Sequence, residues 1–176
     1  CLKRLYNAEV TRDLSGLLKG DEDFAKFRLD YYSNQPDESG NIPREIMEII
    51  LTMCKNYAAK FDGKGTNLIF TGGPGLGKTF LSACIARSVS RKGYSVAYDS
   101  ASTALGAFEK EKFSRDMDEA AAAGARVKQY LACDLLILDD LGTEMTTAFV
   151  QSALYTIINT RLMEEKSTII STNLMP

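Results

Sequence analysis

The sequence predicts an α/β fold in which a parallel sheet is covered by helices on both faces. Short apolar runs alternate along the chain with longer segments whose apolar residues recur at helical spacing. A glycine-rich turn joins the first apolar run to a helix, and two later runs end in polar residues. Because the carboxyl ends of parallel strands meet at one edge of a sheet, these features together predict a ligand site at that edge.

The composition is that of an ordinary globular protein and excludes several functions. The chain has 176 residues, 45% of them hydrophobic and 25% charged, which is enough for one domain with a substantial core. Histidine is absent, so Ser-His-Asp catalysis and histidine-ligated metal sites are excluded. The formal net charge of −2 gives no strong field toward nucleic acid or an anionic membrane. No apolar run is long enough to span a membrane, so no membrane partner is expected.

The cysteines and the N-terminal region indicate location and domain organisation. The chain has four cysteines, Cys1, Cys54, Cys84 and Cys133, and no secretory signal, which fits a reducing, cytoplasmic compartment. Cys54, Cys84 and Cys133 are expected to lie in the core as small hydrophobic residues. The chain begins without Met, which indicates an internal fragment. Residues 1–40 are predicted to be a mainly helical linker, the remnant of an absent upstream module. Its apolar residues are expected to be covered: Phe27, Leu29, Tyr31 and Tyr32. Residues 41–176 are predicted to form the core domain.

Each element of the core has its own signal. Pro43 suits the first turn of a helix, which glycines 63 and 65 end. The apolar face of this helix is predicted to consist of Ile46, Ile50, Met53, Tyr57 and Phe61. Strands are predicted at 68–70, buried within the sheet, and at 94–98, 135–138 and 168–172. Further helices are predicted from the glycine-rich turn to about Arg91, over 102–130 with a break near Ser114, and over 146–161. The apolar members of the last helix are Phe149, Ala153, Tyr155, Ile157 and Ile158.

Residues 72–79 read GGPGLGKT and match the phosphate-loop pattern GxxxxGK[ST]. Glycines allow backbone N–H groups to approach phosphate oxygens, and the N-terminus of the following helix favours an anion. Lys78 can reach the β- and γ-phosphates, and Thr79 offers a hydroxyl to Mg²⁺. The predicted nucleotide contacts are Gly72, Gly73, Pro74, Gly75, Leu76, Gly77, Lys78, Thr79 and Phe80.

Two later strand ends carry the polar groups that a nucleotide site requires. Asp139 and Asp140 follow a fully apolar run, and a cation at the strand end would pair their charge. We assign Asp139 to Mg²⁺, directly or through water, and Asp140 to polarising the attacking water as a general base. Asn173 follows the last strand and could hold that water against the γ-phosphate. The alternative is that these residues are only a solvated strand end and a loop residue.

These motifs, in this order, resemble the AAA+ ATPases of the bacterial helicase-loader group, which comprises DnaC-like, DnaI-like and IstB-like ATP-binding proteins. The resemblance rests on GGPGLGKT, LLILDDLG and STIISTNL, with the linker segment FRLDYYS before them, and covers about residues 24–176. It implies a P-loop NTPase fold of AAA+ type with strand order 5-1-4-3-2, truncated here after sensor 1. By the same resemblance, residues 72–79 are Walker A, Asp139 and Asp140 are Walker B, and Asn173 is sensor 1.

The resemblance also implies a function. It implies ATP and Mg²⁺ as ligands, ATP hydrolysis, self-association as an AAA+ oligomer, and binding to a replicative helicase and single-stranded DNA under nucleotide control. Three basic residues lie where related initiators carry helices that face DNA: Lys110, Lys112 and Arg115. Acidic residues are interleaved with them, so a solvated face is the alternative. Arg161 is a candidate subunit-contact arginine, although a cation is favourable at a helix C-terminus in any case.

Two departures and three alternatives qualify this expectation. Many AAA+ proteins have Asp-Glu where this chain has Asp-Asp, and Asp140 has a shorter reach than Glu. The arginine finger and sensor 2 would follow Pro176, so turnover of this chain is expected to be weak or absent.

Cys1 resembles the last ligand of a zinc module, but one cysteine cannot hold zinc. The alternative functions are an IstB-like transposition helper, a nucleotide switch without turnover, and a small-molecule P-loop kinase, for which no arginine-rich lid is evident.

Overall fold

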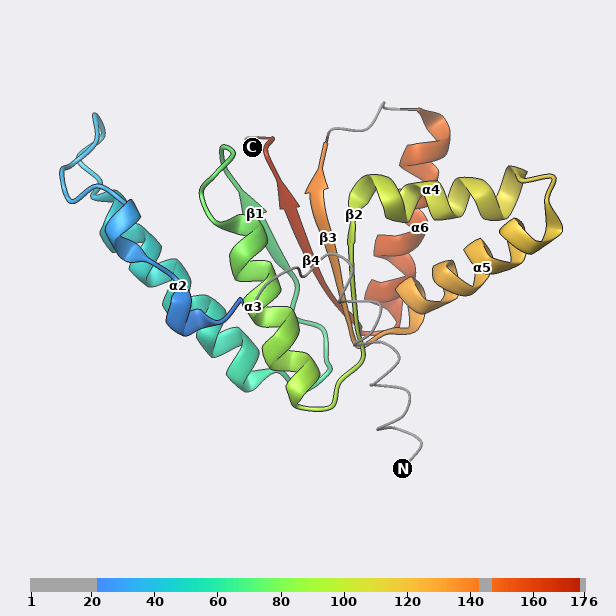
Figure 1. Cartoon of the computed structure of the whole chain (residues 1–176), viewed down its shortest axis with the longest axis horizontal. Coiled ribbons are helices and arrows are strands. Elements are labelled where there is room, and N and C mark those ends of the chain that lie inside the picture. The colour runs from blue at the N-terminus through green and yellow to red at the C-terminus, as the bar shows by residue number, and fades with distance from the viewer. Residues whose placement is uncertain (1–21, 143–146, 175–176) are drawn as a thin grey trace.

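A parallel sheet of four strands forms the centre of the computed structural model, which describes residues 22–142 and 147–174 (Figure 1). The strands are β1 (Leu68–Thr71), β2 (Val96–Ser100), β3 (Leu135–Leu141) and β4 (Ser167–Thr172). Their spatial order is β1-β4-β3-β2 and every pair is parallel. The predicted α/β class is therefore confirmed, and the order matches the 1-4-3-2 part of the order that the resemblance implies.

Helices cover both faces of the sheet (Figure 1). One face packs against α2 (Pro43–Lys60) and α3 (Lys78–Arg91), and the other against α4 (Ala101–Phe113), α5 (Met117–Ala132) and α6 (Ala148–Met163). Successive residues of β3 point to opposite faces, and the four residues Leu135 to Leu138 are all buried. This explains why β3 reads as a continuous apolar run in the sequence. Among the described residues, none of the helices has the length and apolarity that a membrane crossing requires.

The buried face of α2 differs from the predicted one. The buried residues of α2 form a neighbouring stripe, Met47, Leu51, Cys54 and Ala58. This stripe belongs to the same core cluster as the buried residues of α3. In the predicted stripe, Ile46 and Met53 are 42% and 60% exposed, although Phe61 is buried as expected. The helix is apolar over both stripes, so spacing alone could not identify the one that faces the core.

Two further apolar residues lie at the surface, contrary to expectation. Ile69 in β1 is 68% exposed, because β1 is an edge strand that pairs only with β4 among the described strands. Tyr155 in α6 is 69% exposed, because α6 buries Ala153, Ile157 and Arg161, which recur every four residues along the opposite side of the helix.

The N-terminal segment packs on the core through aromatic rings. Its described part contains two 3-10 helices, η1 (Phe24–Lys26) and η2 (Leu29–Tyr31), while residues 1–21 of the predicted linker lie outside the described residues. The rings of Phe27 and Tyr32 stack with centroids 5.9 Å apart, and both pack against the core. Tyr31 was expected to be covered but is 77% exposed, because its ring lies under the Arg28 guanidinium at the surface.

The predicted break in the 102–130 region is confirmed. The α4 helix ends before Ser114, and the carboxylate of Asp116 caps α5 by accepting the N–H groups of Asp118 and Glu119. The three core cysteines, Cys54, Cys84 and Cys133, are buried as predicted, and Cys1 lies outside the described residues. The α4–α5 hairpin projects from the sheet on the side opposite α2 (Figure 1).

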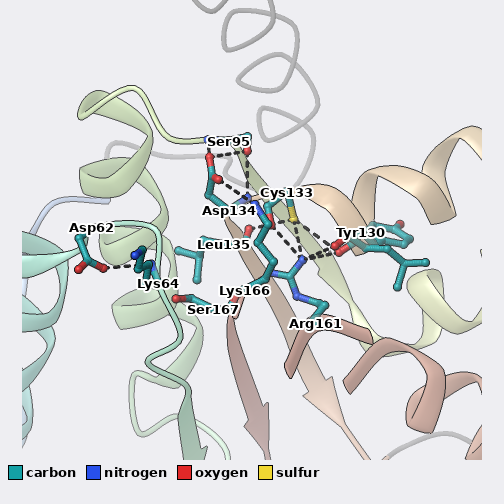
Figure 2. A network of polar contacts seen from close by, with 11 residues as sticks. Asp62, Lys64, Ser95, Tyr130, Cys133, Asp134, Leu135, Arg161, Lys166 and Ser167 are labelled. Carbon is teal, nitrogen blue, oxygen red and sulfur yellow. Dashed lines mark hydrogen bonds and ion pairs between the residues drawn. The ribbon is translucent and has the colours of Figure 1, made fainter. Parts of the chain in front are cut away.

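Arg161 forms hydrogen bonds with several segments at the amino edge of the sheet, where the strands begin (Figure 2). Its side chain is fully buried, and the guanidinium donates to the carbonyl oxygens of Tyr130 at 2.6 Å, Cys133 at 3.0 Å and Ser167 at 2.5 Å. It also donates to the Thr168 hydroxyl at 2.9 Å. A side chain with no exposed area is not available to another subunit, so the candidate role of Arg161 as a subunit-contact arginine is wrong.

A second polar cluster lies at the same edge (Figure 2). The Asp134 carboxylate accepts the Ser95 N–H at 2.9 Å, the Ser95 hydroxyl at 2.7 Å and the Lys166 ammonium at 3.2 Å. The Ser95 hydroxyl in turn accepts the N–H of Asp134 at 2.9 Å. Burial raises the pKa of Asp134, but these hydrogen bonds and the Lys166 charge outweigh it and hold the pKa below its usual value.

Candidate nucleotide-binding site

The predicted site residues converge at the carboxyl edge of the sheet, where the strands end. Apart from Gly72 and Gly73, whose carbonyl oxygens accept hydrogen bonds from Lys78, the predicted nucleotide-site residues line a cavity of about 670 Å³ between the β1–α3 loop and the ends of β2, β3 and β4. Its walls include the loop from Pro74 to Thr79 and the side chains of Asp139, Asp140 and Asn173. Phe80 also lines it. The structure thus brings the three predicted motifs to one place, as the parallel topology requires.

The phosphate loop leads directly into α3. The helix begins at Lys78, and Gly77 at its N-cap has a φ of 88°, which favours glycine. A Cβ atom at Gly77 would lie 3.0 Å from the Tyr32 hydroxyl and 3.2 Å from the Phe27 ring, so the N-terminal segment also packs tightly against this position. The first N–H groups of a helix have no intrahelical acceptor and lie at its positive end. The start of α3 is therefore suited to binding an anion.

The ammonium of Lys78 connects the phosphate loop to β4. It donates to the carbonyl oxygens of Gly72 at 2.6 Å and Gly73 at 2.8 Å, and to Oδ1 of Asn173 at 2.8 Å. The amide of Asn173 then donates to Oδ1 of Asp140 at 2.8 Å. One continuous chain of hydrogen bonds therefore joins the predicted lysine, asparagine and second aspartate.

A β-bulge allows the two adjacent acids to share the cavity. Leu138 pairs with Ile170 and Leu141 with Thr172, so two residues of β3 lie opposite one residue of β4. Asp140 in the bulge has a φ of 58°, which is uncommon for a residue with a side chain. Consecutive residues of a regular strand point to opposite faces, whereas Asp139 and Asp140 both line this cavity. The sequence showed the acidic pair but contained no signal for the bulge.

Two hydroxyl groups that the sequence analysis did not identify hold Asp139. The Tyr98 hydroxyl on β2 donates to Oδ2 of Asp139 at 2.7 Å, and the Ser171 hydroxyl on β4 donates to Oδ1. Ser171 also accepts the N–H of Asp140 at 3.0 Å. Burial and the charge of Asp139 raise the pKa of Tyr98 well above its usual value, so its hydroxyl stays protonated. Only strand register brings these residues to Asp139, and register is not readable from the local pattern.

The donor set fits a magnesium ion bound together with phosphate. The Thr79 hydroxyl and the Asp139 carboxylate line the same cavity, and both are the hard oxygen ligands that Mg²⁺ prefers. Within residues 22–142 and 147–174, no three His, Cys, Asp or Glu side chains form a self-sufficient metal cluster. Because Mg²⁺ in nucleotide sites takes its other ligands from phosphates and water, one carboxylate and one hydroxyl are sufficient.

A second, apolar cavity of about 840 Å³ adjoins the phosphate loop. It runs along the open edge of β1 and the exposed stripe of α2, and its walls include Tyr32, Ile50, Tyr57 and Ile69. Both cavities include Leu76 and Lys78, so they meet at the loop. The loop therefore has one side that faces the carboxylates of Asp139 and Asp140 and another side that faces apolar residues.

The predicted DNA-binding residues lie outside both cavities, on the α4–α5 hairpin. Lys110 forms an ion pair of 2.9 Å with Glu119. The Lys112 ammonium lies 5.5 Å from the ring centroid of Phe113 and 5.8 Å from that of Phe149, and Phe113 is 60% exposed. Arg115 is exposed between the two helices. The structure separates these residues from the site at the carboxyl edge.

The strand order and the loop, acids and asparagine at one edge define a P-loop NTPase of the AAA+ class. The model of the IstB-like ATP binding protein family matches residues 53–175, which is more than half of the chain. The chain therefore belongs to this family and is a DnaC/IstB-like AAA+ ATPase core. The family is a class of ATP-binding AAA+ ATPases.

Individual relatives agree with this assignment. The replicative helicase loader DnaC of Escherichia coli K12 is 27% identical over 127 residues, which cover 70% of this chain and 49% of DnaC. The chain thus spans about half the length of the curated relatives it matches. A crystal structure of the DnaC helicase loader superposes with a TM-score of 0.64 at 24% identity, covering 87% of this chain and 80% of that one. A structure of the replication initiator DnaA bound to AMPPCP and single-stranded DNA superposes with a TM-score of 0.60 at 23% sequence identity. The match covers 72% of this chain and 38% of that one. At these identities the two structures establish the fold.

Proposed function

We propose that this chain binds ATP with Mg²⁺ and hydrolyses it as the ATPase core of a helicase-loader-like protein of DNA replication. The observation that carries the proposal is the hydrogen-bonded chain from Lys78 through Asn173 to Asp140 beside the N-terminus of α3. It connects a cation for phosphate, an amide and a carboxylate, which are the groups that phosphoryl transfer to water requires.

Each side chain has a distinct part in this proposal. The backbone N–H groups from Gly72 to Thr79, except at Pro74, which has none, bind phosphate oxygens. Lys78 exchanges its carbonyl acceptors for the more strongly accepting phosphates. Thr79 and Asp139 hold Mg²⁺, which neutralises developing negative charge when bound. Asn173 and Asp140 orient the attacking water, and Asp140 accepts its proton. Catalysis is then mainly electrostatic positioning.

The apolar cavity supports a nucleotide rather than a bare polyphosphate. A nucleotide has an anionic end and a flat, apolar base, and the two cavities that meet at Leu76 and Lys78 offer one environment for each. The Tyr32 hydroxyl donates to the Leu76 carbonyl at 3.0 Å, so the N-terminal segment is attached to the loop at this junction.

We further propose that nucleotide state controls binding to a helicase and to single-stranded DNA, within an AAA+ oligomer. The similarity to DnaC supports the helicase, and that to DnaA with bound single-stranded DNA supports the DNA. Control by nucleotide requires contacts that differ between states. The bond between Lys78 and Asn173 is such a contact, because a bound phosphate competes for the ammonium.

The family match also supports a second candidate, an IstB-like helper of a transposase. The two candidates share the nucleotide site and differ in the protein partner. Co-purification of the full-length protein distinguishes them: a replicative helicase in the eluate supports the first, and a transposase without helicase supports the second.

Replacing Lys78 tests the nucleotide site. We expect Lys78→Ala to weaken ATP–Mg²⁺ binding by roughly 10- to 100-fold, because a hydrogen bond to a charged group contributes about 1.5–3 kcal/mol. Asp140→Asn is the matched control within the site: it keeps binding and loses turnover. Isothermal titration calorimetry measures binding, and phosphate release measures turnover in the full-length protein. Unchanged affinity in Lys78→Ala would refute the proposed site.

A further inference from the structure

The carboxylate of Asp139 is held from both sides by strands that flank its own. Tyr98 on β2 donates to one oxygen at 2.7 Å and Ser171 on β4 donates to the other. Tyr98 and Ser171 are only 6% and 1% exposed, so water does not readily replace either hydroxyl. Both donors lie on elements of the sheet and not on loops, which gives them fixed positions.

This arrangement restricts Asp139 to one orientation. A carboxylate that accepts one hydrogen bond on each oxygen cannot rotate without breaking both, yet each oxygen keeps a second lone pair for a cation or its water. Ser171 has a second task, because it also accepts the N–H of Asp140 in the bulge.

We propose that Tyr98 and Ser171 are positioning residues that orient Asp139 toward the Mg²⁺ of the bound nucleotide. The inference rests on the proposed function. The two residues differ in what they hold: Tyr98 orients Asp139 alone, whereas Ser171 orients Asp139 and fixes the backbone of Asp140. Loss of Tyr98 therefore affects the metal, and loss of Ser171 affects both the metal and the orientation of the attacking water.

The primary test is Tyr98→Phe, which removes one oxygen atom and keeps the ring. Binding of a fluorescent ATP analogue is titrated with Mg²⁺ and, separately, measured in EDTA. We expect the Mg²⁺ concentration at half-saturation to rise about tenfold or more, the usual effect of losing a group that orients a metal ligand. Binding in EDTA stays unchanged, because the phosphate loop is untouched. Ser171→Ala shows the same metal shift and also lowers turnover of the full-length protein at saturating Mg²⁺.

Other buried hydroxyls of the sheet and its helices offer matched controls. Tyr130→Phe also removes a buried phenol hydroxyl from a carboxylate, since Tyr130 donates to Asp99 at 2.6 Å. Ser95→Ala removes a hydroxyl that bridges an Asp carboxylate and N–H at Asp134, as Ser171 does at the acidic pair. Both controls have comparable effects on folding and leave the Mg²⁺ titration unchanged.

Three outcomes decide the matter. A metal shift in Tyr98→Phe that is absent in Tyr130→Phe supports the inference. An unchanged Mg²⁺ midpoint in Tyr98→Phe, or an equal shift in the controls, overturns it even when the unmutated chain binds ATP normally. An unmutated chain that binds no nucleotide, with or without Mg²⁺, contradicts the proposed function itself.

Discussion

At the scale of single residues, Arg161 shows how a buried charge can be accommodated by neutral acceptors. Its guanidinium is fully buried and is satisfied by carbonyl oxygens at the end of α5 and the start of β4. The sequence identified a favourable cation at the end of a helix. It could not show that two of the acceptors, Tyr130 and Cys133, lie 31 and 28 residues upstream, because those residues meet Arg161 only in the folded chain. Arginine suits this position because its planar fork presents several donors at once.

Removal of this side chain should destabilise the whole domain. We expect Arg161→Met to lower the free energy of unfolding by about 3 kcal/mol or more, since each buried carbonyl left without a donor costs about 1–3 kcal/mol. Urea denaturation followed by circular dichroism measures this. Arg115→Met, at an exposed position, is the control and should change stability by no more than about 0.5 kcal/mol. Equal effects in the two variants would contradict the structural role of Arg161.

At the scale of elements, periodicity predicted the helices and strands well and their buried faces less well. The break between α4 and α5 and the start of α3 followed from capping residues and from the phosphate loop, which are local signals. The burial of Met47 rather than Ile46 and the exposure of Ile69 were not predictable, because they depend on which element lies alongside. The bulge at Asp139 and Asp140 arises from register between strands, for the same reason.

The cluster that joins the starts of β2, β3 and β4 should make stability depend on pH. Because the folded state holds the pKa of Asp134 below its usual value, its ionised form stabilises the fold at neutral pH. This contribution is lost as the pH falls below about 4 and through the lowered pKa. We expect Asp134→Asn to cost about 1 kcal/mol at neutral pH, and the difference from the unmutated chain to shrink in acid. Urea denaturation of both proteins across this pH range measures the difference in their free energies of unfolding. A difference that stays constant with pH would argue against the pKa shift.

At the scale of the whole molecule, the parallel order places the loop, the acids and Asn173 at one edge and the α4–α5 hairpin to one side (Figure 1). The sequence predicted this convergence because topology alone requires it. It did not predict the surface of the hairpin, where Lys112 lies over two aromatic rings and Lys110 is already paired with Glu119. Of the two rings, Phe113 is exposed. An exposed aromatic ring with a nearby cation is the kind of group on which single-stranded bases stack.

Charge reversal on the hairpin tests this surface. We expect the double variant Lys112→Glu and Arg115→Glu to weaken binding of a labelled single-stranded oligonucleotide and to reduce its salt slope by about 1.4, or about 0.7 for each phosphate that the protein no longer neutralises. Fluorescence anisotropy over a salt series measures both. The control variant reverses Lys55 on α2 and Arg91 on α3, helices that cover the other face of the sheet, and changes net charge equally. A slope that changes equally in both variants would place the DNA surface elsewhere.

The hydrogen bonds of Arg161 and Asp134 hold one end of the strands, and the phosphate loop and acids lie at the other. Energetic effects of substitutions at well-separated sites usually add. A substitution at the carboxyl edge therefore leaves the stabilising hydrogen bonds at the amino edge in place. Variants designed to disrupt the proposed nucleotide site are therefore expected to remain folded, which makes them suitable for searching for binding partners of the full-length protein.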